Sequence, residues 1–200
     1  TPERRSALPH KRRGDQLAKR GRFEAAARAY RQAIATDYTY QAAYNELGTT
    51  LFALKRYGVA IKTFRIAVRD NPDYDLGWYN LAYALRKARR NREAISAYQK
   101  YARKHPKDPD PHYGMGLAYR ALSDKPAAIA AFNRYISLEG RASHEKWLAR
   151  AQHAVRTLGG EPAKAGSKVA PVSSGGVLVA GATPKGKSAT PKGKGATPKG

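Results

Sequence analysis

The side chains that most often perform catalysis are few in this chain and poorly arranged for it. There is no cysteine, which excludes disulfides, thiolate metal sites and thiol nucleophiles. His144-Glu145 begins like the zinc-protease motif H-E-x-x-H, but Leu148 stands where the second histidine is required. Asp108 and Asp110 lie in a proline-rich loop and are typical turn residues. We therefore expect no catalytic residue, no metal site and no cofactor, and a protein that is not an enzyme.

A second pattern, at residues 181–188, fits the phosphate-binding motif G-x4-G-K-[ST] and follows an apolar stretch at 177–180. That motif works only when a helix follows the lysine and directs its N-terminal amides at the phosphate. The 12 residues that remain after Ser188 are rich in glycine and proline and cannot supply this helix. The match arises from the repetition of Pro-Lys-Gly-Lys, and we expect no nucleotide binding.

The C-terminal segment differs in composition from the rest of the chain. Residues 160–200 contain 9 Gly, 5 Pro and 7 Lys and no aromatic residue, and Thr-Pro-Lys-Gly recurs at 183, 190 and 197. Such a segment cannot bury enough apolar surface to fold, so residues 159–200 are predicted to be a disordered tail. The tail loosely resembles those of linker histones, which bind phosphate backbones by charge; the alternative is a solubilising tether.

Residues 1–158 are organised by a period of 34 residues, most clearly in the stretch 41–74. A shift by this period aligns Ala60 with other alanines, and Phe64 with other aromatic residues. The aligned positions are Ala26, Ala60, Ala94 and Ala128, and Tyr30, Phe64, Tyr98 and Phe132. A fixed period of this length is typical of a stacked array of helix pairs.

The predicted fold is therefore all-α, with repeats at 7–40, 41–74, 75–108 and 109–142. Residues 1–8 show no clear pattern, and the first helix is expected from Pro9 to Lys19. An amphipathic helix at 143–158 should cap the array and cover its exposed apolar face. Small residues such as Gly48 and Ala60 should let paired helices approach closely, while aromatic rings fill the space around them.

These residues resemble the tetratricopeptide repeat, whose pattern is W-x2-L-G-x2-Y, then A-x3-F, then P. Repeat 41–74 matches through Tyr44, Leu47, Gly48, Leu51, Ala60, Phe64 and Pro72, and the resemblance covers about 7–142. It implies a right-handed α-solenoid of antiparallel helix pairs, in which the first helices line a concave groove. It also implies binding of a protein or peptide partner.

Groove-facing residues are predicted by removing the motif positions from each first helix. Asn45 and Asn80 would hydrogen-bond an extended peptide backbone, and tyrosines would supply broad contact area. Lys11, Arg86 and Arg120 would favour an acidic partner; the alternative is a merely solvated face. The predicted groove residues are Lys11, Asn45, Thr49, Phe52, Tyr79, Asn80, Tyr83, Arg86, Tyr113 and Arg120.

One specialised site of the family is a clamp for a chaperone's C-terminal carboxylates, built from two lysines, two asparagines and an arginine. Lys11 occupies the place of the first lysine. Asp15 and Glu46 stand in the two asparagine places, Leu76 in that of the second lysine and Asn80 in that of the arginine. One match in five argues against this clamp.

The formal net charge of +23 favours attraction to polyanions. Cations crowd the N-terminal residues 4–22 and the stretch 86–92. The alternative function is therefore weak association with nucleic acid or another polyanion through the basic repeats and the tail.

Location and assembly are less strongly indicated. No apolar run is long enough to cross a bilayer, and no signal peptide is visible. Because the chain begins at Thr1 and its single methionine is Met115, we expect a fragment or a processed chain. The compartment stays open between the cytoplasm, which we favour, and the cell envelope. We expect a monomer in isolation.

Overall fold

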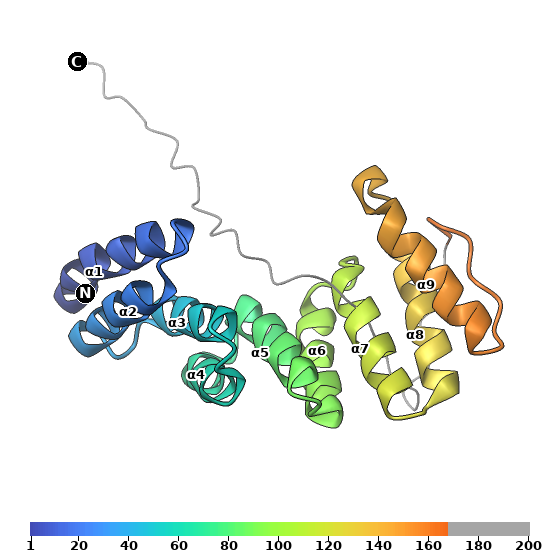
Figure 1. The fold of residues 1–200 in the computed structure, drawn as a ribbon, viewed down its shortest axis with the longest axis horizontal. Helices are drawn as coiled ribbons and strands as arrows, with labels where there is room; N and C mark the ends of the chain where they lie inside the picture. The colour runs from blue at the N-terminus through green and yellow to red at the C-terminus, as the bar shows by residue number, and fades with distance from the viewer. Residues whose placement is uncertain (168–200) are drawn as a thin grey trace, which may run out of the picture.

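The computed structural model describes residues 1–167, which are built almost entirely from helices (Figure 1). This part holds nine α-helices and one short 3-10 turn, Ala142–His144, and no strand. The helices are α1 Pro2–Lys19, α2 Phe23–Thr36, α3 Gln41–Ala53, α4 Tyr57–Asp70, α5 Asp75–Lys87, α6 Asn91–Lys104, α7 Asp110–Ala121, α8 Lys125–Leu138 and α9 Glu145–Thr157.

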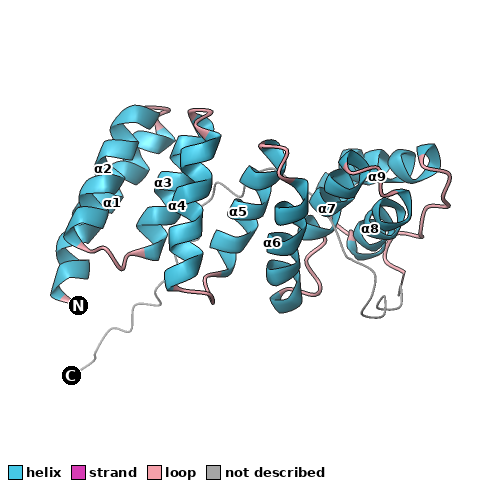
Figure 2. Ribbon diagram, turned by 90° about the horizontal axis from the view of Figure 1, so that it is seen from below, coloured by secondary structure: helices cyan, strands magenta, loops and turns pink. Residues whose placement is uncertain are grey.

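The helices form four antiparallel pairs, α1–α2, α3–α4, α5–α6 and α7–α8, which follow one another along the long axis of the molecule (Figures 1 and 2). Each second helix packs on the first helix of the next pair, and α9 packs on α8. The first helices also contact each other in order, α1 with α3, α3 with α5 and α5 with α7. Elements on the inside of a curved stack lie closest together, so we call the face made by α1, α3, α5, α7 and α9 the inner face.

This arrangement confirms the predicted all-α solenoid of antiparallel helix pairs. The tail's Thr-Pro-Lys-Gly repeats and the phosphate-loop pattern at 181–188 lie outside the described residues. The structure does describe 159–167, the beginning of the segment predicted to be disordered. There the Asn133 side chain donates to the Glu161 carbonyl at 2.9 Å and accepts from the Ala163 amide at 2.7 Å. These two bonds hold the segment against α8.

The first helix is longer than the sequence pattern indicates, because it begins at Pro2 instead of Pro9. The Thr1 hydroxyl caps it by accepting from the Arg4 amide. The Arg4 side chain pairs with Asp37 at 2.5 Å and lies 4.0 Å over the Tyr40 ring. Pro9 is tolerated inside the helix although it lacks an amide hydrogen. Contacts to residues more than 30 positions away therefore order a stretch without local periodicity.

Glycine and aromatic residues form the repeated packing contact predicted within the helix pairs. A Cβ atom added to Gly48 would lie 2.6 Å from the Phe64 ring, and one added to Gly116 would lie 2.8 Å from Phe132. The rings therefore lie directly against the backbone of the first helix. Ala60 and Ala128, on the second helices, are fully buried. Close approach of paired helices depends on these small residues.

The turn between the two helices of a repeat has the same backbone conformation each time. One residue in it has a positive φ, between 59° and 71°. These residues are Gly21, Lys55, Arg89 and Ser123, each 34 positions from the next. The period of the sequence is thus also a period of the backbone dihedral angles.

None of the helices within residues 1–167 combines the length and apolar character needed to cross a lipid bilayer.

Candidate functional site

The N-terminal part of the inner face carries both signs of charge. The Lys11 ammonium pairs with Asp15 at 2.9 Å, and the Tyr30 hydroxyl donates to the same carboxylate at 3.0 Å. Glu46 lies close to both Lys11 and Asp15, and burial raises the pKa of its carboxyl group. Because two carboxylates surround Lys11, this end of the inner face is a poor site for an acidic group.

The middle of the inner face is uncharged and carries the two predicted asparagines. They lie side by side, and the Asn80 amide nitrogen donates to the Asn45 amide oxygen at 3.0 Å. Their exposed fractions are only 1% for Asn45 and 4% for Asn80. The Asn80 amide oxygen has no hydrogen-bond partner within residues 1–167. The pair joins α3 to α5, and part of its hydrogen-bonding capacity is used for that purpose.

Thr49, Phe52 and Tyr83, which were predicted from the sequence as groove residues, lie together beside Asn80. Together with the Phe64 ring they line a cavity of about 10 Å³, which is at the lower limit for one water molecule. The Phe52 and Tyr83 ring centroids are 5.2 Å apart. These residues thus form a dense aromatic surface, and no deep pocket lies between them.

Arg86 lies beside Tyr83, and together with Lys87 it makes this part of the inner face cationic. The Arg86 guanidinium is 5.2 Å from the centroid of the Tyr83 ring, and the Lys87 ammonium is 5.7 Å from it. Both positions allow cation–π attraction to the ring. Within residues 1–167, neither cation forms an ion pair with a carboxylate.

Tyr79 requires a correction, since it was predicted to face a partner and is fully buried. Its ring meets those of Tyr98 and Tyr101 edge-on, with centroids 5.8 Å and 5.2 Å away. It fills the space between α5 and α6 and belongs to the core.

The C-terminal end of the inner face contains a cleft of about 540 Å³ between α7 and α9. Tyr113 forms part of its wall and packs edge-on against Trp147, with ring centroids 5.7 Å apart. The Arg150 guanidinium lies 4.9 Å over the Trp147 ring. Within residues 1–167, none of the residues that line the cleft carries a carboxylate. The lining residues are Tyr113, Arg120, Lys146, Ala149, Arg150, His153 and Ala154.

The positive potential of this cleft acts on the Tyr113 hydroxyl. Burial raises the pKa of Tyr113, and three nearby guanidinium groups, those of Arg150, Arg120 and Arg86, oppose the rise. These three arginines come from α5, α7 and α9, so cationic groups converge on this end of the inner face from three helices.

Sequence reasoning missed the contribution of α9, which was predicted only to cap the array. Lys146, Arg150 and His153 lie at positions i, i+4 and i+7 and so share one helix face. That stripe lies opposite the apolar stripe that packs on α8. The spacing was a usable signal, but the neighbouring Arg120 is 26 or more positions away in the sequence.

One cluster of potential metal ligands, Asp110, Glu139 and His144, lies at the corner before α9. The Arg141 guanidinium occupies it, 2.5 Å from Asp110 and 2.6 Å from Glu139. Burial acts to raise the pKa of Glu139, but hydrogen bonds from Arg141 outweigh it and lower the pKa to about 2. The arrangement is an ion-pair network that ties this corner to the start of α7.

Comparison with known proteins supports the architecture. The family model described as "Tetratricopeptide repeat" matches residues 11–75 and 79–144. A crystal structure of MamA protein superimposes with a TM-score of 0.69 at 22% identity, over 76% of this chain and 80% of that chain. No curated protein matches in sequence.

Two further similar structures are named as peptide-binding proteins. YrrB, "a TPR protein with an unusual peptide-binding site", has a TM-score of 0.65 at 18% identity, over 76% of this chain and 75% of that chain. The first such domain of Spaghetti (RPAP3), bound to the HSP90 peptide SRMEEVD, has a TM-score of 0.55 at 21% identity, over 62% of this chain and 95% of that chain.

Proposed function

Because the chain belongs to the tetratricopeptide repeat family, we propose that it is a non-enzymatic adaptor that holds a segment of a partner protein on its inner face. The proposal extends to the chemistry of the segment, which we infer to be acidic. The single observation that carries it is the cationic cleft between α7 and α9.

The cleft suits carboxylate side chains better than the rest of the inner face does. Arg120 and Arg150 offer planar guanidinium groups, which bind carboxylates through two parallel hydrogen bonds. Lys146 adds an exposed ammonium group to the lining. Near Lys11, by contrast, Asp15 and Glu46 would repel an acidic segment. The inner face therefore has an acid-binding end at α7–α9 and an acid-repelling end at α1–α3.

The aromatic residues in the middle of the inner face support contact with the backbone of the same segment. Thr49 and Phe52 are half-buried on α3, and Tyr83, which is 9% exposed, lies beside them on α5. A tyrosine or phenylalanine ring supplies contact area at a low cost in side-chain entropy. The segment would extend from this aromatic surface to the cleft.

The related proteins support peptide binding in general. One is named for a peptide-binding site, and another holds a peptide with three carboxylate side chains. The clamp residues of the chaperone-binding type are nevertheless mostly absent here, and the cationic cleft of this chain lies at the opposite end of the array.

A direct test uses fluorescence anisotropy with a labelled glutamate-rich peptide and the same peptide with glutamine in place of glutamate. The double variant Lys146→Gln/Arg150→Gln should weaken binding of the acidic peptide by about tenfold, since each of the two charged contacts contributes about 0.7 kcal/mol at an exposed site. The matched control is Lys62→Gln/Arg103→Gln, which removes the same charges from exposed positions on α4 and α6.

The control should change the dissociation constant by less than about twofold. Equal losses in the two double variants would show that only net charge matters. Equal binding of the glutamine peptide would show that the cleft does not select acidic side chains.

A further inference from the structure

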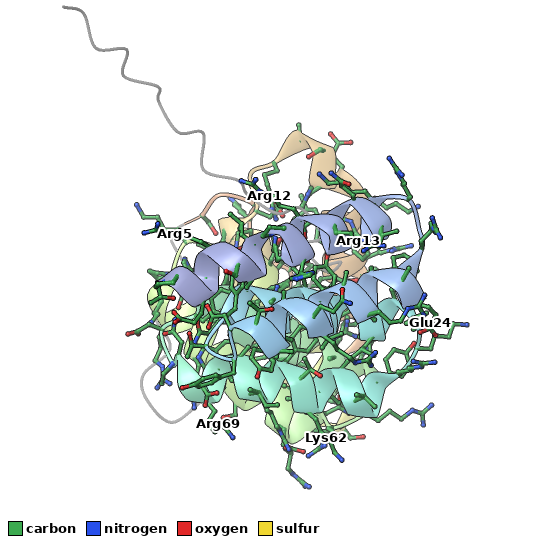
Figure 3. The ribbon with its side chains drawn as sticks, turned by 90° about the vertical axis from the view of Figure 1, so that its left-hand side faces the viewer. Arg5, Arg12, Arg13, Glu24, Lys62 and Arg69 are labelled. Carbon is green, nitrogen blue, oxygen red and sulfur yellow. The ribbon has the colours of Figure 1, made fainter. Side chains whose placement is uncertain are left out.

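The turns between the two helices of each repeat lie along one long edge of the solenoid. We call residues 19–22, 55–56 and 87–92, in the turns of the first three repeats, the turn edge; the turn of the fourth repeat carries Asp124 beside Lys125 and is not part of it. We call the loops 37–40, 70–75, 105–110 and 139–142 the loop edge. Figure 3 looks along the stack from the N-terminal end: Glu24, just after the first turn, lies on the side opposite to Arg5 and Arg69. The two edges are therefore separate surfaces, and the turn edge borders the inner face at Lys87, which lies beside Tyr83.

The two edges carry opposite charges. The turn edge contains nine lysines and arginines and no acidic residue. The loop edge contains seven acidic residues and only two, Lys107 and Arg141, that are basic at neutral pH. A net charge of +23 is thus distributed unevenly, and one edge concentrates it.

Most cations of the turn edge are available to a ligand. Arg56 pairs with Glu24, and Arg90 pairs with Glu93. The other seven form no ion pair with a carboxylate within residues 1–167; they are Lys19, Arg20, Arg22, Lys55, Lys87, Arg89 and Arg92. Their side chains are exposed and lie in three groups, one for each of the first three repeats.

The backbone gives a second and independent observation. Lys55 and Arg89 both have a φ of 59°, the left-handed conformation that Gly21 adopts at the equivalent position of the first repeat. Glycine takes this conformation without the steric cost that a side chain adds. Two long cationic side chains therefore occupy positions where folding alone would favour glycine. Every repeat makes this turn, and Ser123 adopts the same φ without a charge, so the feature specific to Lys55 and Arg89 is the cationic side chain that each carries there.

We propose that the turn edge binds the phosphate backbone of a nucleic-acid duplex without reading its sequence. A duplex presents regularly spaced phosphates, and a row of unpaired lysines and arginines displaces the counterions condensed on them. Binding of a single strand relies on aromatic rings on which bases stack. The most exposed aromatic ring, that of Tyr38 at 78%, lies on the loop edge. The turn edge offers cationic groups without an exposed aromatic ring for stacking, which favours binding of a duplex over a single strand.

The test removes two charges from the turn edge without introducing strain. Lys55→Gly/Arg89→Gly takes both side chains from left-handed positions, so the thermal unfolding midpoint should not fall. The matched control is Arg103→Gln/Lys107→Gln, which removes the same charges at exposed positions on the other side of the stack. All proteins keep the full chain, so the seven lysines of the segment 160–200 contribute equally.

Binding to a labelled DNA duplex of about 20 base pairs is measured by anisotropy over a series of salt concentrations. The slope of log K against log salt should fall by about 2 in the turn-edge variant and stay unchanged in the control. The acidic peptide used for the inner face should bind the turn-edge variant as it binds the parent, so failure of one proposal is distinguishable from failure of the other.

Three results would overturn the proposal. The first is an equal slope in the parent and the turn-edge variant, and the second is an equal fall in both variants. The third is preference for another partner: tighter binding of a single strand of the same length, or displacement of the duplex by polyglutamate at equal charge concentration.

Discussion

His112, in the first turn of α7, is a histidine that the folded chain holds without a proton. Its side chain is 2% exposed, and its Nδ1 atom has no hydrogen-bond partner within residues 1–167. Burial lowers the pKa of His112 from 6.5 to about 3, and the positive charge of Arg134 adds to that effect. Acid should therefore destabilise the fold through this residue.

The direction follows from which state binds the proton. In the unfolded chain His112 has its ordinary pKa of 6.5. Below that pH, the unfolded state therefore binds a proton that the folded state does not bind. The free energy of unfolding should fall by about 1.4 kcal/mol for each pH unit below this value. The loss reaches about 2 kcal/mol at about pH 5 and about 5 kcal/mol once the folded state also protonates, at about pH 3.

The measurement is urea unfolding followed by circular dichroism, at about pH 7 and about pH 5, for the parent and for His112→Phe. Other groups titrate as well: burial raises the pKa of Glu46, which acts in the opposite direction. The quantity of interest is therefore the difference between the two proteins, in which shared contributions cancel.

His112→Phe should lose about 2 kcal/mol less than the parent between these two pH values. The exposed residue His153 provides the control, because His153→Gln should follow the parent closely. If His112→Phe and the parent lose the same free energy on acidification, a neutral buried imidazole is not the cause of acid sensitivity. The explanation would then fail whatever the absolute stability of the variant.

Three further predictions concern stability and can be checked by urea or thermal unfolding. Gly48→Ala should lower the free energy of unfolding by about 1–3 kcal/mol, because the added Cβ would clash with the Phe64 ring. Gly58→Ala, whose Cβ would have no neighbour within 4 Å, should stabilise α4 by about 0.5–1 kcal/mol. Equal effects of the two substitutions would refute the contact between Gly48 and Phe64. Arg141→Gln should cost about 2 kcal/mol because the buried Glu139 carboxylate loses its charged donor, and an unchanged urea midpoint would contradict this role. Ser123→Gly should raise stability by about 0.5 kcal/mol by relieving a φ of 60°, and any loss would argue against strain at this turn.

The fold was predictable because the residues that recur every 34 positions are those that pack. Ala60 and Phe64 have counterparts in every repeat, and the structure buries all eight side chains. Periodicity of this kind reports contacts within a helix pair and between neighbouring pairs, and a solenoid contains few others. The long-range topology is thus encoded locally.

The face that a non-consensus residue presents was less predictable. Tyr79 and Tyr83 lie one helical turn apart on α5, and removing the motif positions left both as groove candidates. The space between α5 and α6 accepts the Tyr79 ring, while Tyr83 stands beside Phe52. The motif identifies the packing positions, but whether a residue at another position is buried depends on the helix that packs against it.

Features that depend on distant residues were missed for a similar reason. The start of α1 depends on the pairing of Arg4 with Asp37, and the cationic cleft depends on the placement of α9 beside α7. The acidic residues of the loop edge and the cations of the turn edge are visible in the sequence. Their separation becomes apparent only when the four repeats are superimposed.

The contact between glycine and ring has a consequence for how such an array can change in length. Gly14 meets Tyr30, Gly48 meets Phe64 and Gly116 meets Phe132, and in each case both partners belong to the same helix pair. Each of these helix pairs therefore has its own glycine–ring contact, and this contact stays in place when a neighbouring pair is added or removed. Duplication or loss of one 34-residue unit would lengthen or shorten the inner face and the turn edge by the same step. Both proposed binding surfaces would then evolve together in units of a single repeat.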